Sequence, residues 1–129
     1  METFSVQTES RSQFVDITDR VSSCVKQSGI EEGICSVYVP HTTAAVTINE
    51  NADPSVKADI QMEMDKVIPL RDNYSHAEGN SAAHIKSSLI GESVCVPISE
   101  GKLALGTWQG IFFCEFDGPR TRRVNVLVK

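Results

Sequence analysis

The stretch WQGIFFCEFDGPRTRRVNVLV, residues 108–128, decides the fold of this chain. It begins with a long apolar run from Trp108 to Phe116, which predicts a strand. Residues 117–119, Asp-Gly-Pro, are typical of a tight turn. Apolar and polar residues then alternate from Arg122 to Val128, the pattern of a strand with one buried face. Two strands joined by so short a turn pair antiparallel, so the C-terminal third predicts an antiparallel sheet.

Other strands are predicted on both sides of this hairpin. Short runs rich in β-branched residues, or with strict alternation, occur at residues 4–7, 34–39, 44–48, 93–98 and 103–105. The two β regions enclose a helical middle, and the strands follow one another like hairpins, without regular βαβ alternation. The sequence therefore predicts an α+β fold, an antiparallel β-sandwich with about three helices.

Apolar spacing and end signals predict these helices at about residues 18–28, 54–68 and 80–90. Thr18, Asp53 and either Asn80 or Ser81 are placed to cap their N-termini. Residues 70–80 have no apolar period and are rich in Asp, Asn, Ser and Gly, so we expect a long loop. Loops of this length in compact domains often carry function.

Size and charge limit the class of protein. The 129 residues suit one domain, 1–129, and 40% hydrophobic with 22% charged residues is typical of a globular chain. A net charge of −5 argues against binding of nucleic acid or of an anionic membrane surface. No leader-like or spanning segment and no paired CxxC cysteines occur, which predicts reduced thiols and a cytoplasmic location.

Three histidines stand out because each lies among polar or small residues: His41, His76 and His84. Imidazole is the commonest metal ligand and transfers protons near neutral pH. We expect the three rings to converge, with every pair within roughly 10 Å if they share a metal. In that case they are the candidate ligands of a divalent metal, Zn or Mg. Without a metal, the same three rings would form an acid–base or anion-binding cluster.

Acidic, amide and hydroxyl side chains lie near these histidines in the sequence. Glu50, Glu78 and Gln109 are the candidate catalytic groups, with Glu50 chosen because it has no local structural duty such as the helix cap of Asp53. Thr42, Thr43 and Asn80 are candidate ligand-binding residues.

Two arginines complete the candidate site. Alternation places Arg120 and Arg122 on one face of the last strand. Because two neighbouring guanidiniums repel each other, the pair predicts an anion bound between them.

Four strings of sequence resemble the successive motifs of the YjbQ-like family, in order and over most of the chain. They are HTTAAVTINENADPSV (41–56), HAEGNSAAHIKSSLIG (76–91), SVCVPISEGKLALGTWQGI (93–111) and EFDGPRTRRVNV (115–126). The resemblance implies an α+β fold with a β-sandwich and a homotrimer. It also implies activity as a secondary thiamine-phosphate synthase, which joins a pyrimidine pyrophosphate to a thiazole phosphate and releases pyrophosphate.

Two other functions remain open from the residues. One is a non-catalytic trimeric protein that binds a small phosphorylated or other anionic metabolite. The other is a metal-dependent hydrolase, because three histidines with one open position resemble a catalytic zinc site. Turnover of the two thiamine precursors, with and without added divalent metal, separates these alternatives.

Overall fold

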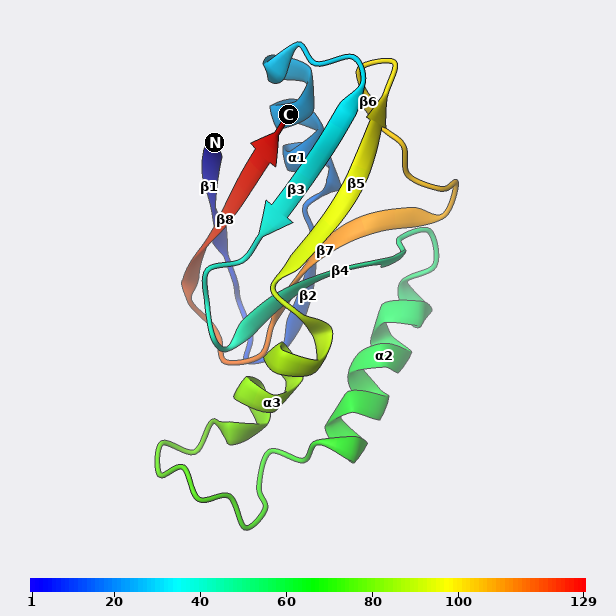
Figure 1. Cartoon of the computed structure of the whole chain (residues 1–129). Coiled ribbons are helices and arrows are strands. Elements are labelled where there is room, and N and C mark those ends of the chain that lie inside the picture. The colour runs from blue at the N-terminus through cyan, green and yellow to red at the C-terminus, as the bar shows by residue number, and fades with distance from the viewer.

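Eight strands form two antiparallel sheets in the computed structural model, which describes residues 1–129 (Figure 1). The five-stranded sheet has the order β1 (Glu2–Gln7), β8 (Thr121–Val128), β3 (Gly33–Tyr38), β5 (Ser93–Ser99) and β6 (Lys102–Leu103). The three-stranded sheet has the order β2 (Gln13–Asp16), β7 (Gln109–Glu115) and β4 (Ala44–Glu50). All pairings are antiparallel, so the predicted fold class is confirmed.

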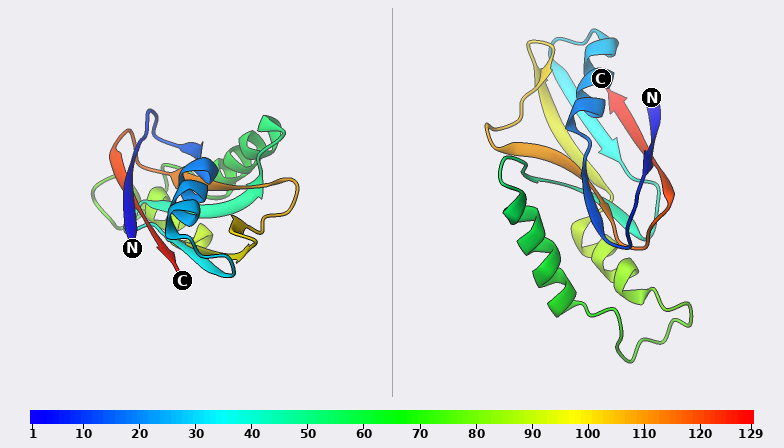
Figure 2. Two further views of the ribbon diagram at one scale, coloured as in Figure 1. Left: turned by 90° about the horizontal axis from the view of Figure 1, so that it is seen from above. Right: turned by 180° about the vertical axis from the view of Figure 1, so that it is seen from behind.

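The main core lies between the two sheets and α1 (Thr18–Ser28), which runs along one side of them (Figure 2). Val21 and Val25 of α1 are buried against strands from both sheets, among them Val37 of β3 and Phe113 of β7. Burial of a side chain of this size stabilises the fold by about 1.5–3 kcal/mol. The helix and the two sheets therefore form one packed unit.

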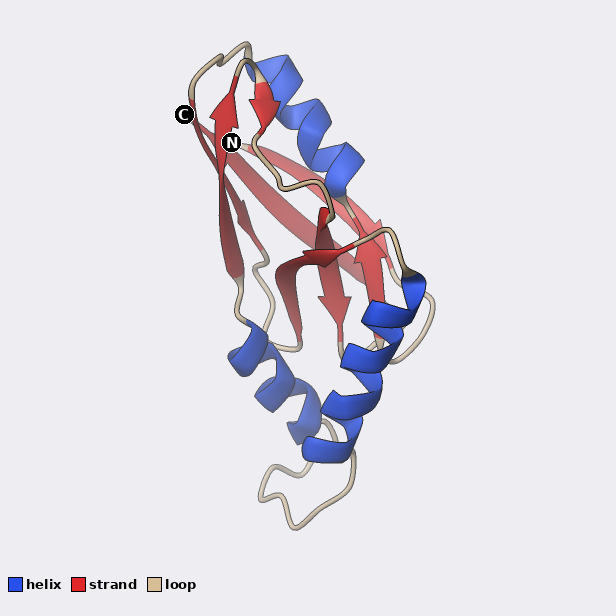
Figure 3. Ribbon diagram, turned by 90° about the vertical axis from the view of Figure 1, so that its right-hand side faces the viewer, coloured by secondary structure: helices blue, strands red, loops and turns tan.

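The opposite face of the three-stranded sheet is covered by α3 (Ser81–Ile90) and, more loosely, by α2 (Pro54–Val67) (Figure 3). Phe112 and Cys114 of β7 face these helices, whereas Ile111 and Phe113 face the main core. Because both faces of β7 are covered, its sequence is apolar without alternation. β8 has one covered face and alternates as predicted.

The three predicted helices are present, but only one N-terminus is capped as predicted. Asp53 accepts hydrogen bonds from the backbone and hydroxyl of Ser55 at the start of α2. Thr18 is the first residue of α1 and donates its hydroxyl to Asp16, so it is not the cap. Asn80 occupies the N-cap position of α3, but its side chain makes no capping bond.

The strand predictions differ from the structure in three places. The strands before and after residues 117–119 do not form the predicted hairpin, because β7 pairs with β2 and β4 whereas β8 pairs with β1 and β3 of the other sheet. β2, Gln13–Asp16, was not predicted because it has only four residues. The strand predicted at 103–105 is the two-residue β6, Lys102–Leu103. The four cysteines are free, and none of the three helices has the length and apolar character needed to cross a membrane.

Candidate functional site

A cavity of about 390 Å³ opens where the turn before β4, the start of α3 and the turn between β7 and β8 meet, and none of its ten lining residues is hydrophobic. We call it the polar cavity; it is lined by Pro40, His41, Thr42, Thr43, Glu78, Asn80, His84, Asp117, Arg120 and Arg122. Eight of these ten are residues that the sequence predicted for the site. Its volume is in the range of small-molecule sites, so it is the candidate functional site.

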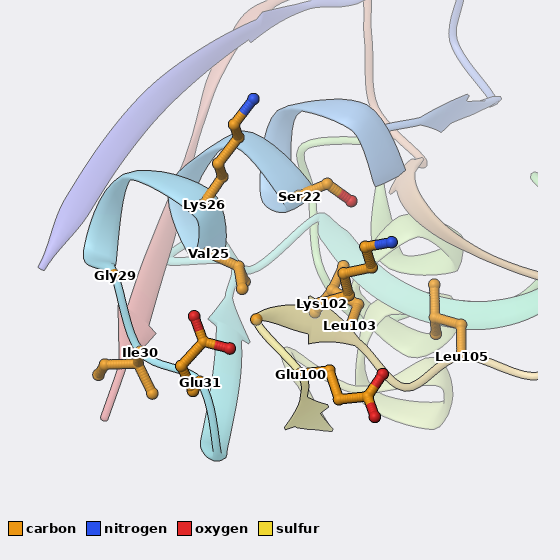
Figure 4. A pocket seen from close by; sticks show the side chains of 11 residues that line it. Ser22, Val25, Lys26, Gly29, Ile30, Glu31, Glu100, Lys102, Leu103 and Leu105 are labelled. Carbon is orange, nitrogen blue, oxygen red and sulfur yellow. The ribbon is translucent and has the colours of Figure 1, made fainter.

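A larger cavity of about 610 Å³ lies on the other side of the molecule, between α1 and the hairpin of β5 and β6 (Figure 4). Its charged side chains are two lysines, Lys26 and Lys102, and two glutamates, Glu31 and Glu100. It holds no histidine and none of the predicted site residues. Size alone therefore does not make it the better candidate.

A buried ion pair forms the floor of the polar cavity. Glu115 has no exposed surface and Arg122 is 5% exposed. Arg122 donates from Nε to Glu115 Oε1 at 2.8 Å and from its second terminal nitrogen to Oε2, and that same nitrogen donates to Thr43 Oγ1 at 2.9 Å. The ion pair thus connects β7, β8 and the turn before β4.

Glu115 also accepts hydrogen bonds from the hydroxyl of Thr8 and the backbone N–H groups of Phe116 and Asp117. Burial by itself raises the pKa of Glu115, but the hydrogen bonds from Arg122, Asp117 and Thr8 outweigh it and hold the pKa below the ordinary value of 4.5. Glu115 is therefore ionised near neutral pH, as a buried partner of arginine must be.

Arg120 is paired as well. Its Nε donates to the backbone oxygen of Asp117 at 2.7 Å and its NH2 nitrogen to Asp117 Oδ2 at 3.1 Å. Asn80 Nδ2 donates to the same carboxylate oxygen at 2.9 Å. Since both arginines are neutralised within the chain, the argument that their repulsion requires an anion between them is wrong. The sequence had not identified Asp117 and Glu115 as the partners of the two arginines.

His41 is held in one tautomer by the neighbouring strand. Its Nε2 accepts the backbone N–H of Arg123 at 2.9 Å, which places the proton of the neutral ring on Nδ1. Burial lowers the pKa of His41 below the ordinary value of 6.5, and the charges of Arg122 and Arg123 add to this effect. Its one lone pair is already engaged, so His41 can donate a hydrogen bond but is not free to bind a metal.

Acid should destabilise the protein through His41. The unfolded chain binds a proton at this residue as the pH falls through 6.5, while the folded chain does so only at lower pH. We expect the melting temperature to fall between pH 7 and pH 5, and the His41→Gln variant to show a smaller fall. Thermal denaturation across this range measures it, and an unchanged pH slope in the variant would contradict the assignment.

The other two histidines lie together at the rim of the polar cavity. The ring centroids of His76 and His84 are 5.4 Å apart in an edge-to-face arrangement. His76 Nε2 is 3.6 Å from Glu78 Oε2. His84 and Glu78 line the polar cavity, and His84 also shares a shallow pocket with His76. The rim therefore brings together two imidazoles and a carboxylate, the side chains most often used in general acid–base catalysis.

The three histidines do not form a metal site within one chain. No group of three or more His, Cys, Asp or Glu side chains is arranged to hold a metal ion. The predicted convergence brings His84 beside His76 and into the cavity that His41 lines, but the lone pair of His41 points to Arg123. The donor set of one chain thus does not fit Zn or Mg.

A family model described as "UPF0047 protein YjbQ-like" matches residues 2–129. The chain belongs to the YjbQ-like family. It is 54% identical over 125 residues to the UPF0047 protein of Methanocaldococcus jannaschii, covering 97% of this chain and 91% of that protein. To YugU of Bacillus subtilis it is 50% identical, covering 95% and 93%.

Solved structures agree with this YjbQ-like fold. An uncharacterised conserved protein of the YjbQ/UPF0047 family from Clostridium acetobutylicum superposes with a TM-score of 0.99 at 53% identity, with 100% of both chains covered. A "YbjQ-like protein of unknown function" from Sulfolobus solfataricus gives 0.95 at 36% identity, covering 98% of this chain and 94% of that one. None of these four descriptions states an activity.

Two predicted catalytic residues of this YjbQ-like chain lie away from the polar cavity. Glu50 pairs with Gln109 at one end of the β4–β7 ladder, whereas Ala44 pairs with Glu115 at the cavity end. The six residue steps from Ala44 to Glu50 span about 20 Å of extended strand. Gln109 also accepts the backbone N–H of Gly106 through Oε1. Within one chain these two residues are therefore not part of the polar cavity, because nearness in sequence to the histidines did not mean nearness along the strand.

Two residues of the site were not predicted. Asp117 binds Asn80 and Arg120, but its sequence context indicated only a turn residue. No role was predicted for Glu115 from the sequence. A signal was present: alternation in β8 puts Arg122 on the same face as Val124 and Val126, and a buried arginine requires a carboxylate partner.

Proposed function

We propose that the polar cavity binds a small phosphorylated metabolite and that His84, with His76 and Glu78, transfers protons at its rim. The observation that carries this proposal is the cavity itself, which collects eight predicted polar residues from three distant segments and no hydrophobic one. Polar walls offer no hydrophobic contact to an apolar substrate. Their hydrogen-bond donors do stabilise the oxygens of a phosphoryl group.

Several hydrogen-bond donors support an anionic ligand. His41 offers Nδ1–H, Arg120 is half exposed, and Thr42 adds its hydroxyl. The N-terminus of α3 has neither a side-chain cap nor an acidic residue in its first turn, so its positive end is not neutralised locally. Glu78 carries the opposite charge and suits the role of a base better than that of a ligand clamp.

The reaction that fits best is the one implied by the resemblance to secondary thiamine-phosphate synthases. A thiazole nitrogen forms a bond to the methylene carbon of the pyrimidine pyrophosphate, the carbon–oxygen bond breaks, and pyrophosphate leaves with the bonding electrons. His84 is placed to protonate the departing oxygen, and the donors of the polar cavity to hold the phosphate of the thiazole substrate. Non-catalytic binding of one phosphorylated metabolite is the alternative.

The same resemblance implies a homotrimer. In support, α2 has no fully buried residue, and Val67, Leu89 and Trp108 are 74%, 71% and 63% exposed. Apolar residues this exposed in one chain are suited to burial between subunits. Sedimentation velocity at micromolar concentration tests the assembly. A cytoplasmic location remains a prediction from the four free cysteines.

Inorganic phosphate is a direct probe of the polar cavity. We expect it to bind, and the Arg120→Ala variant to bind it about five- to tenfold more weakly, because a charge-assisted hydrogen bond at a half-exposed site is worth somewhat more than 1 kcal/mol. Isothermal titration calorimetry measures the affinity.

The matched control is Arg123→Ala, which removes an equal charge three residues further along the chain, at a residue that does not line the cavity. Its effect should stay within about twofold, since exposed charges are screened. Equal losses in the two variants would mean that net charge, not the cavity, controls binding. No phosphate binding by the wild-type protein would refute the proposed ligand class.

A further inference from the structure

Two arginines meet in a cavity that the proposed function does not yet use. Arg11 precedes β2 and Arg71 lies in the loop after α2, sixty residues further along the chain. Both line a cavity of about 350 Å³, together with Asp72, Tyr74, His76 and Gly79. We call it the Arg11–Arg71 cavity.

Neither guanidinium has a partner. Of the six arginines, Arg120 and Arg122 pair with carboxylates, and Arg20 lies over the ring of Phe4 and donates to Ser5. The guanidiniums of Arg11 and Arg71 make no hydrogen bond or ion pair. Because both side chains are exposed and line one cavity, an anion bound there can contact the two guanidiniums at once.

The other polar groups of this cavity do not compete for the arginines. Asp72 Oδ1 accepts the backbone N–H of Asn73 at 2.8 Å, and the hydroxyl of Tyr74 donates to the backbone oxygen of Pro69 at 2.5 Å. Asp72 is the only acid in the lining, against two arginines. The cavity therefore offers an excess of positive charge and many free N–H donors, which suit the oxygens of a phosphoryl group.

The position of this cavity relates it to the candidate site. His76 lines the Arg11–Arg71 cavity and touches His84, which lines the polar cavity. The histidine pair thus stands between two cavities. A reaction that joins two phosphorylated molecules needs one anion subsite on each side of the group that transfers the proton.

We propose that Arg11 and Arg71 form a second phosphoryl subsite, which takes the pyrophosphate end of one substrate while the polar cavity takes the phosphate of the other. The subsite rests on the proposed function for its role in the reaction. Its ability to bind pyrophosphate rests on the two arginines alone.

Pyrophosphate titrations test the subsite. By calorimetry we expect the wild-type protein to bind inorganic pyrophosphate, Arg11→Gln and Arg71→Gln to bind it about tenfold more weakly each, and the double variant more weakly still. Arg123→Gln removes a third guanidinium that makes no hydrogen bond or ion pair and lies outside this cavity, so it should change the affinity by no more than about twofold. Because Arg11 and Arg71 are exposed and make no side-chain bonds, unchanged melting temperatures are expected for all the variants.

The outcomes separate this subsite from the proposed function. If Arg11→Gln and Arg71→Gln weaken pyrophosphate no more than Arg123→Gln, the subsite is refuted, while phosphate binding that depends on Arg120 still supports the proposed function. If pyrophosphate requires Arg11 and Arg71 but phosphate does not require Arg120, the subsite stands and the proposed function falls. Failure of the wild-type protein to bind either anion refutes both.

Discussion

Replacing Glu115 with glutamine should lower the free energy of unfolding by about 3–5 kcal/mol, because it leaves the buried guanidinium of Arg122 without a counter-charge. Glutamine keeps the size of the side chain, so the loss reports charge and hydrogen bonding rather than a cavity. The amide also gives up acceptor capacity toward Thr8 and the backbone N–H groups of Phe116 and Asp117. Chemical denaturation measures the change.

The matched control is Glu63→Gln on α2. Glu63 also pairs with a basic residue, Lys66, at 3.0 Å, but the two side chains are 60% and 64% exposed. Its loss should cost about 0–1 kcal/mol. Equal effects of the two substitutions would contradict the assignment of Glu115 and Arg122 as a buried pair that holds the floor of the site.

The pH dependence gives a second check on Glu115. Its folded pKa lies below 4.5, so the stability it contributes is fully present above the unfolded pKa and is lost as the pH falls through the folded pKa. The glutamine variant cannot titrate there. Its acid-unfolding curve should therefore be shallower below about pH 4.5 than that of the wild-type protein.

Replacing His84 with glutamine should lower turnover of the two thiamine precursors by about 10²–10⁴-fold, the usual contribution of a general acid or base. His84 lies on the first turn of α3, where one side chain reaches both the polar cavity and His76. Because its role is proton transfer, the loss should appear in kcat more than in KM. Steady-state assays of product formation measure both.

Two comparisons make the result specific. Glu63→Gln, on the exposed face of α2, should leave kcat unchanged within about twofold, and phosphate binding by the His84→Gln variant should remain. If the His84→Gln variant kept the activity of the wild-type protein, His84 would have no part in the reaction. Phosphate binding without turnover in the wild-type protein would favour the non-catalytic alternative.

Local patterns predicted most of the fold. The start of α2 was predicted from Asp53, whose side chain caps the helix, and from Pro54, whose missing N–H is tolerated at the first helical position. Both effects act within three residues. The strand β8 follows from its alternation, but its predicted pairing with β7 is wrong, because the turn at residues 117–119 leads from one sheet to the other. The four-residue β2 was missed because it is too short to show a period, and only its pairing with β7 makes it a strand.

The site was predicted less completely. Eight of the ten residues lining the polar cavity were named from polar character and from the family resemblance. Glu50 and Gln109 were wrongly grouped with them, since a strand carries residues six positions apart to opposite ends of a sheet. The metal role of His41 disagrees with the hydrogen bond from Arg123, a contact between residues 82 positions apart.

The sequence by itself determined the type and order of the elements and the polar segments that supply the site, because periodicity, helix caps and turn residues act over a few positions. Only the tertiary structure decided which charges are neutralised. The pairing of Glu115 with Arg122 and Thr8, and the meeting of Arg11 with Arg71, depend on strand register and loop packing. These contacts join residues that nothing in the local pattern connects, so their partners became visible only when the chain was folded.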